Sequence, residues 1–154
     1  MVIVTAKLNK VKIAGVFLAA AAVILLVILL ANRSGPDTEA AGRRKLDTPE
    51  SKVEFLASCG YTVKPDPARV QEVRIPEDWN EVYTQYNALQ KSQGFDLSRY
   101  KGKTVMQYVY QVENYPGDNG DPVWATMLLY KNKLIGADLS RGGAESFLRP
   151  LLAA

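Results

Sequence analysis

Nineteen consecutive residues, Ile13 to Ala31, contain no charged, proline or hydroxyl-bearing side chain. As a helix with a rise of about 1.5 Å per residue, this run spans roughly 28 Å, which is close to the hydrocarbon thickness of a bilayer. Its leucine, isoleucine and valine content favours insertion into lipid. The sequence therefore predicts one transmembrane helix at residues 13–31, with membrane lipid as its partner.

A cleaved secretion signal is the alternative for this segment. Such signals carry an apolar region of about 7 to 15 residues followed by a small-x-small cleavage site. Here the apolar run is longer, and the sequence Leu30-Ala31-Asn32-Arg33-Ser34 at its border lacks a good small-x-small pair. An uncleaved anchor is favoured. A buried helix of a soluble domain is disfavoured, because a domain this small cannot cover a helix that is apolar on all sides.

Basic residues near the ends of a transmembrane helix indicate its orientation. Residues 1–12 form a short basic flank with Lys7, Lys10 and Lys12, and the segment is followed by Arg33 and the more distant cluster at residues 43–45. Lys10 and Lys12 lie closer to the apolar segment than that cluster. This difference favours a cytoplasmic N-terminus and an extracytoplasmic C-terminal domain in the cell membrane.

The rest of the chain divides into a linker and one domain. Residues 32–47 are rich in glycine, proline, serine and charges, which is typical of a flexible linker, and residues 48–154 have the size of one soluble domain. Seven of the 19 basic residues but only two of the 16 acidic residues precede residue 46. The domain is therefore slightly acidic, which argues against a nucleic-acid partner.

The chain has a single cysteine, Cys59, and no histidine. These counts exclude an intrachain disulfide, a cysteine-based zinc site and catalysis that uses an imidazole base. We expect Cys59 to be a small buried apolar residue rather than a reactive thiol, since no adjacent basic residue would lower its pKa. No cofactor and no metal are expected.

Apolar periodicity and turn residues predict the elements of the domain. A helix runs from the cap Thr48 to Gly60, and an aromatic stripe with helical spacing indicates a second helix over residues 77–92. Strand patterns cover residues 61–64, 69–75, 103–113, 123–130 and 134–139. An amphipathic stretch over residues 144–152 is expected to form a last helix. This order predicts an α+β domain, whose antiparallel sheet of four to five strands ends in a C-terminal meander and has helices packed on one face.

The aromatic stripe has two interpretations. An aromatic face can bind a sugar or a peptide, but this spacing is more typical of the side of a helix that packs on a sheet. We expect the stripe to cover the strand face that carries Met106, Tyr108 and Tyr110. The residues of the stripe are Trp79, Val82, Tyr83, Tyr86 and Leu89.

Asp118, Asn119 and Asp121 lie together in a segment rich in turn residues. A calcium loop needs oxygen ligands at alternate positions, glycine at the sixth position and glutamate at the twelfth, and this register fails. A hairpin loop explains the same residues, because asparagine, aspartate, glycine and proline favour tight turns. The three side chains are kept as a candidate interaction surface.

One long segment carries a resemblance to a known family. It includes Glu72 to Trp79, Gly94-Phe95-Asp96-Leu97, Tyr100 to Lys103 and Ile135 to Asp138, within roughly residues 50–140. It resembles a domain of unknown function found in small membrane-anchored proteins of Gram-positive, spore-forming bacteria. The family usually has tryptophan and glycine where this chain has Tyr61 and Ala137. The resemblance implies an anchored, extracytoplasmic location and supplies no catalytic residues.

Two classes of function are consistent with the sequence. The first is a non-enzymatic binding or sensing module that meets an envelope or membrane protein, and the absence of histidine, phosphate loops and nucleophile motifs favours it. The second is a carboxylate-dependent hydrolase of cell-wall glycan, which needs no histidine. Its candidate acids are Glu113, Asp118, Asp121 and Asp138.

Overall fold

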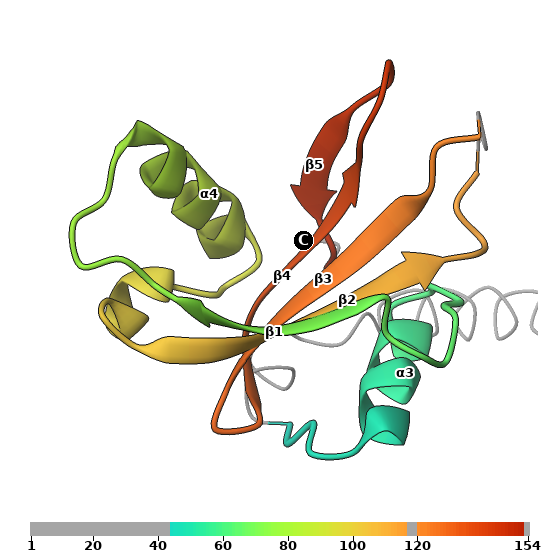
Figure 1. Ribbon diagram of the computed structural model, residues 1–154, viewed down its shortest axis with the longest axis horizontal. Coiled ribbons are helices and arrows are strands. Elements are labelled where there is room, and N and C mark those ends of the chain that lie inside the picture. Colours follow the sequence, from blue (N-terminus) through green and yellow to red (C-terminus); the bar gives the residue numbers. More distant parts are fainter. Residues whose placement is uncertain (1–43, 117–119, 153–154) are drawn as a thin grey trace, which may run out of the picture. The chain divides into compact units, whose positions relative to one another are not determined.

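The computed structural model describes residues 44–116 and 120–152, which form an α+β domain around a five-stranded antiparallel sheet (Figure 1). The strands pair in chain order, β1-β2-β3-β4-β5, so neighbours in the sheet are also neighbours in the sequence. The α+β class and the antiparallel sheet are confirmed. The elements are α3 (Pro49–Ser58), β1 (Arg69–Arg74), α4 (Glu81–Ser92), the 3-10 helix η1 (Leu97–Tyr100), β2 (Thr104–Val112), β3 (Val123–Tyr130), β4 (Lys133–Arg141) and β5 (Phe147–Pro150).

Side chains at their first turns fix where the two α-helices begin. Thr48 caps α3: its hydroxyl accepts a hydrogen bond from the N–H of Ser51, whose hydroxyl accepts one from the N–H of Thr48. Asn80 caps α4 by accepting from the N–H of Tyr83 at 3.0 Å. The second helix therefore begins at Glu81, four residues later than the pattern predicted, because Asn80 satisfies the free backbone donors.

The two α-helices cover opposite faces of the sheet (Figure 1). On β2, Tyr110 belongs to the core that contains Phe55 of α3, whereas Val105, which points to the other face, belongs to the core beneath α4 and η1. The prediction that the helices share one face is therefore wrong. The aromatic stripe also does not cover Met106, Tyr108 and Tyr110, which face the α3 side.

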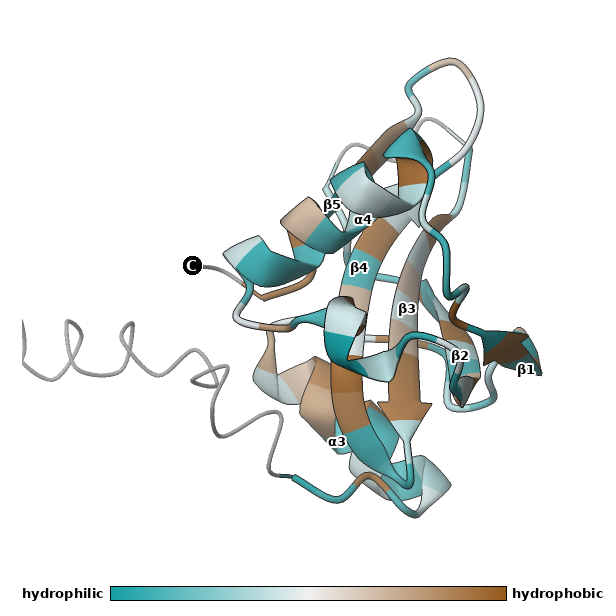
Figure 2. Ribbon diagram, turned by 90° about the vertical axis from the view of Figure 1, so that its left-hand side faces the viewer, coloured by the Kyte–Doolittle hydropathy of each residue, from teal (hydrophilic) through white to brown (hydrophobic). Residues whose placement is uncertain are grey.

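The cause of this error lies in β2 itself. Successive side chains of a strand point to opposite faces, and β2 has apolar residues at both even and odd positions. Figure 2 shows the same along β3 and β4, where hydrophobic residues dominate the central strands. Both faces of the central sheet therefore need a cover, and one helix packs on each.

The C-terminal stretch predicted as an amphipathic helix contains a strand instead. Residues Phe147–Pro150 form β5, which pairs with the edge of β4 so that Arg141 lies opposite Phe147 and Asp138 opposite Pro150. An extended chain satisfies the free edge of β4, and Pro150 disfavours a helix here because it lacks an N–H donor. The short strand predicted over residues 61–64 is reduced to one bridge, between Val63 and Val112.

Two buried glutamines, Gln90 of α4 and Gln93 directly after it, continue the coverage of β4 beyond β5. Because β5 ends at Pro150, the backbone groups of Ala137 lack a strand partner on that side. The side-chain oxygen of Gln90 accepts a hydrogen bond from the Ala137 N–H at 2.9 Å, and the amide of Gln93 donates to the Ala137 carbonyl at 2.8 Å. These bonds anchor the C-terminal half of α4 against the sheet.

The predicted membrane segment, residues 13–31, and the flank before it lie outside the described residues. Among the residues that the structure describes, no helix has the length and apolarity needed to span a bilayer. Leu46, which the sequence placed in the linker, is fully buried, and its N–H donates to the carbonyl of Asn132 at 2.8 Å.

Candidate functional site

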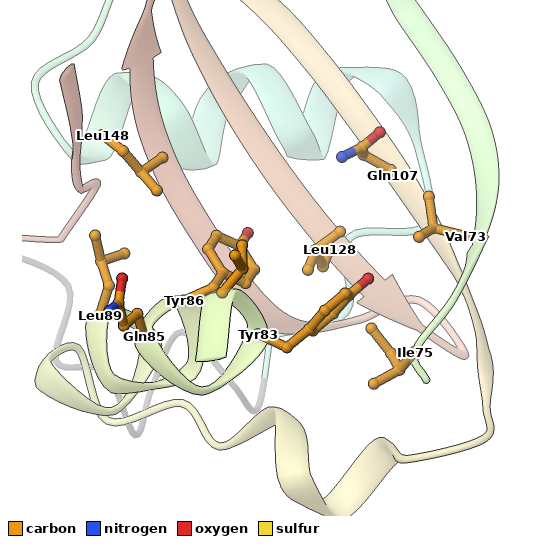
Figure 3. A pocket seen from close by; sticks show the side chains of 10 residues that line it. Val73, Ile75, Tyr83, Gln85, Tyr86, Leu89, Gln107, Leu128 and Leu148 are labelled. Atoms are coloured by element: carbon orange, nitrogen blue, oxygen red, sulfur yellow. The ribbon is translucent and has the colours of Figure 1, made fainter. Parts of the chain in front are cut away.

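A groove of about 460 Å³ lies between α4 and the sheet face that α4 only partly covers (Figure 3). Five elements contribute side chains to it, and none of the lining side chains is charged. The lining residues are Val73, Ile75, Val82, Tyr83, Gln85, Tyr86, Leu89, Gln107, Leu128 and Leu148. This size and this lining are typical of a site for an apolar ligand with a few polar groups.

The groove exists because α4 is held to the sheet near one end. Tyr86, Gln90 and Gln93, from the middle of α4 to just beyond its end, hydrogen-bond to β4, whereas Val82, in its first turn, is 71% exposed. Leu148 of β5 lines the same groove and is 48% exposed. Two large apolar side chains thus remain open to solvent at one concave site, which marks it as an interaction surface.

A buried carboxyl group lies next to the groove. Asp138 on β4 is 4% exposed and accepts a hydrogen bond of 2.7 Å from the hydroxyl of Tyr86, which lines the groove. Burial raises the pKa of Asp138 to about 6, against the opposing effect of hydrogen bonds from Tyr86 and Thr126. Burial also raises the pKa of Tyr86, so its hydroxyl stays protonated and acts as the donor.

A second, smaller hollow continues along the same sheet face. Its volume is about 290 Å³, and it shares Gln107 with the groove. Trp124, Thr126 and Ser140 contribute to it from β3 and β4, with Arg69 at the edge. The polar and aromatic character of this hollow differs from the apolar groove, so a ligand that extends beyond the groove would meet hydrogen-bonding groups.

Of the loop residues proposed from the sequence, Asp121 is the one that the structure describes, and it does not line the groove. Asp118 and Asn119 are outside the described residues, while Asp121 lines a separate hollow of about 350 Å³ together with Glu113 and Arg141. The carboxylate of Asp121 occupies the space where a side chain at Gly143 would be, and Gly143 has a φ of +83°. Asp121 therefore fits closely against the backbone that leads into β5.

The four candidate acids of a hydrolase are not all brought together. Glu113 and Asp121 line one hollow, whereas Asp138 lies on the sheet face beneath α4 and is hydrogen-bonded to Tyr86. Asp118 is outside the described residues. Among the described residues, no group of three or more histidine, cysteine, aspartate or glutamate side chains is placed to hold a metal ion.

The lone cysteine has an unreactive environment. Cys59 is half-buried at the end of α3, and burial raises its pKa to about 11, with the neighbouring Ser58 and Arg44 acting in the opposite direction. A thiol with this pKa is almost wholly protonated at neutral pH, and the thiolate is the nucleophilic form.

The sequence pattern does not reveal the groove, although it singles out several of its residues. The spacing of Val82, Tyr83, Tyr86 and Leu89 predicts that all four pack in the core. Of these, Val82 is mostly exposed. No local pattern distinguishes Val82 from Tyr83, Tyr86 and Leu89, which are partly buried.

Comparison with protein families matches residues 55–139 to the DUF4830 family, a domain of unknown function. The match covers more than half of the chain, so the chain belongs to this family. No curated protein and no solved structure gives a significant match.

Proposed function

We propose that this member of the DUF4830 family is a membrane-anchored binding module, whose extracytoplasmic domain receives apolar side chains of another envelope or membrane protein in the groove beside α4. The observation that carries the proposal is the uncharged lining of that groove combined with the exposure of Val82 and Leu148. Binding there would remove both side chains from water, and each large aliphatic side chain contributes about 1.5–3 kcal/mol when fully buried.

The polar groups of the groove are suited to positioning a partner rather than to a reaction. Tyr83, Gln85 and Gln107 supply hydroxyl and amide groups among the apolar lining residues. Gln107 already accepts a hydrogen bond of 2.6 Å from Gln71. Such groups orient an apolar ligand and discriminate between partners.

An apolar fluorescent probe tests the groove. We expect N-phenyl-1-naphthylamine to bind the full chain with one saturable site, and Val82→Glu and Leu148→Glu each to weaken binding about tenfold, because each places a charge at an apolar rim. Val70→Glu is the matched control, since Val70 is 47% exposed on β1 but does not line the groove. Probe binding that all three variants weaken equally, or that none weakens, would contradict the proposed site.

The proposed location rests on the apolar segment 13–31 and on Lys10 and Lys12 before it. A C-terminal tag on the full chain reports the location directly. We expect protease added to intact cells without their wall to remove the tag. A tag that survives until the cells are lysed would mean a cytoplasmic domain and would refute the proposed orientation.

A carboxylate-dependent glycan hydrolase is the second candidate, and the shared hollow of Glu113 and Asp121 favours it. Such enzymes place two carboxyl groups about 5 to 9.5 Å apart across the scissile bond. The close fit of Asp121 against Gly143 gives this carboxylate a structural explanation, so we rank the hydrolase below the binding module. Release of sugar from wall glycan by the full chain, abolished by Glu113→Gln, would reverse this ranking.

A further inference from the structure

One end of the described domain gathers four exposed basic side chains, which we call the basic end: Lys45, Lys103, Lys131 and Lys133. Lys45 pairs with Lys133 in an isolated antiparallel bridge. Lys103 directly precedes β2, whose register with β3 places Met106 opposite Leu129 and therefore brings the start of β2 level with Lys131. Residues distant in the sequence thus present one positively charged surface.

No residue of the basic end forms an ion pair in the part of the chain that the structure describes. The ion pairs found there join Arg74 with Glu77, Lys91 with Asp96 and Arg141 with Glu145, and none includes a residue of the basic end. The basic end therefore keeps an excess of positive charge.

Two features of the basic end oppose the stability of the fold. Lys45 and Lys133 are like charges on directly paired residues, an arrangement that destabilises a sheet. Lys131 has a φ of +51° in the tight turn between β3 and β4, where glycine, asparagine and aspartate are the preferred residues. Lysine at positions 45, 131 and 133 is thus unfavourable for folding. This points to a role for these lysines other than stabilising the fold.

We propose that the basic end binds the anionic headgroups of a phospholipid bilayer. The charges are complementary, because anionic headgroups attract clusters of lysine close to the membrane. Lys131 lies 5.4 Å from the ring of Tyr130, and tyrosine is a residue type favoured at membrane interfaces.

The connectivity of the chain agrees with this assignment. Arg44 and Lys45 are the first of the described residues, and Lys45 belongs to the basic end. The sequence leaves only residues 32–43 between them and the segment proposed to cross the membrane, a tether of at most about 40 Å when extended. The inference goes beyond the groove, and its test separates headgroup binding from the proposed anchoring.

The test uses the full chain with vesicles of phosphatidylcholine alone or with phosphatidylglycerol, each containing a dansyl headgroup lipid. Flotation of the protein with neutral vesicles reports whether the predicted segment 13–31 inserts into the bilayer. Energy transfer from the tryptophans to dansyl reports whether the domain contacts the headgroups. We expect transfer to be higher with phosphatidylglycerol and to fall to the neutral level in about 1 M salt, where the Debye length is about 3 Å.

The double variant Lys131→Asn/Lys133→Thr is the decisive comparison. It should abolish the increase in transfer caused by phosphatidylglycerol while raising the melting temperature, because it removes the like-charge pair and the unfavourable turn residue. The matched control Lys64→Gln/Arg69→Gln removes equal charge at the other end of β2, where Lys64 donates its N–H to the carbonyl of Gln111 at 3.0 Å.

Two other outcomes would overturn the inference. If energy transfer does not increase with phosphatidylglycerol, the domain does not contact anionic headgroups. If both double variants lose the increase in energy transfer equally, the net charge of the domain alone explains its contact with anionic headgroups. Absence of flotation with neutral vesicles refutes only the anchor, and the inference then stands if binding to phosphatidylglycerol vesicles still depends on Lys131 and Lys133.

Discussion

Replacing Gln93 with leucine is expected to lower the free energy of unfolding by about 4 kcal/mol. Gln93 is 2% exposed, and its side-chain oxygen accepts hydrogen bonds from the N–H groups of Leu151 and Leu152 at 2.8 and 2.9 Å. Its amide donates to the carbonyl of Ala137 at 2.8 Å. Leucine has a similar volume but leaves three buried backbone groups unpaired, and each costs about 1–3 kcal/mol.

Urea unfolding measures this effect, and Gln85→Leu is the matched control. Gln85 lies on the same helix but is exposed and donates only to Glu81. We expect the control to change the free energy of unfolding by less than about 0.5 kcal/mol. A loss below about 1 kcal/mol for Gln93→Leu would mean that the C-terminal residues are held by their apolar contacts alone. Hydrogen exchange at Leu151 and Leu152 should then also remain slow.

Replacing Asp138 with asparagine is expected to raise the free energy of unfolding at pH 7.5 by about 3 kcal/mol. Burial raises the pKa of Asp138 from 3.8 in the unfolded reference to about 6 in the folded protein. The folded protein therefore binds the proton more tightly than the unfolded chain. Asparagine retains an oxygen that can accept the hydrogen bond from Tyr86 but carries no charge.

The sign of the pH dependence follows from this shift. The stability contributed by protonated Asp138 is fully present below about pH 4, the unfolded pKa, and is lost as the pH rises through about 6, the folded pKa. Wild-type protein should therefore lose stability relative to Asp138→Asn between about pH 4 and pH 7. A difference between the two proteins that stays constant over this range would contradict the raised pKa.

The position of Asp138 connects this stability effect with the groove. Its partner Tyr86 lines the groove, so the carboxylate fixes the orientation of a hydroxyl group beside the proposed ligand site. A buried ionised group that lowers stability and orients a binding-site residue fits the general trade between stability and function. On this view, Asp138→Asn should be more stable and should still bind the apolar probe.

The sequence by itself determined most of the local structure. Thr48 and Gly60 mark the ends of α3 because capping depends on neighbouring residues, and runs of apolar, β-branched and aromatic residues bounded by turn residues define β2 and β3. The family resemblance was also visible, from stretches such as Gly94 to Leu97. The absence of histidine, which is a property of composition alone, excludes every mechanism that needs an imidazole group.

Tertiary structure alone decided which faces meet and where the groove lies. A period of two shows which residues share a face, but Val105 and Tyr110 are both apolar, so the pattern could not assign α3 and α4 to opposite sides. Likewise, the pairing of Tyr86 with Asp138 and the pairing of Lys45 with Lys133 join residues far apart in the chain. Such contacts depend on the register of the whole sheet, which no local pattern contains.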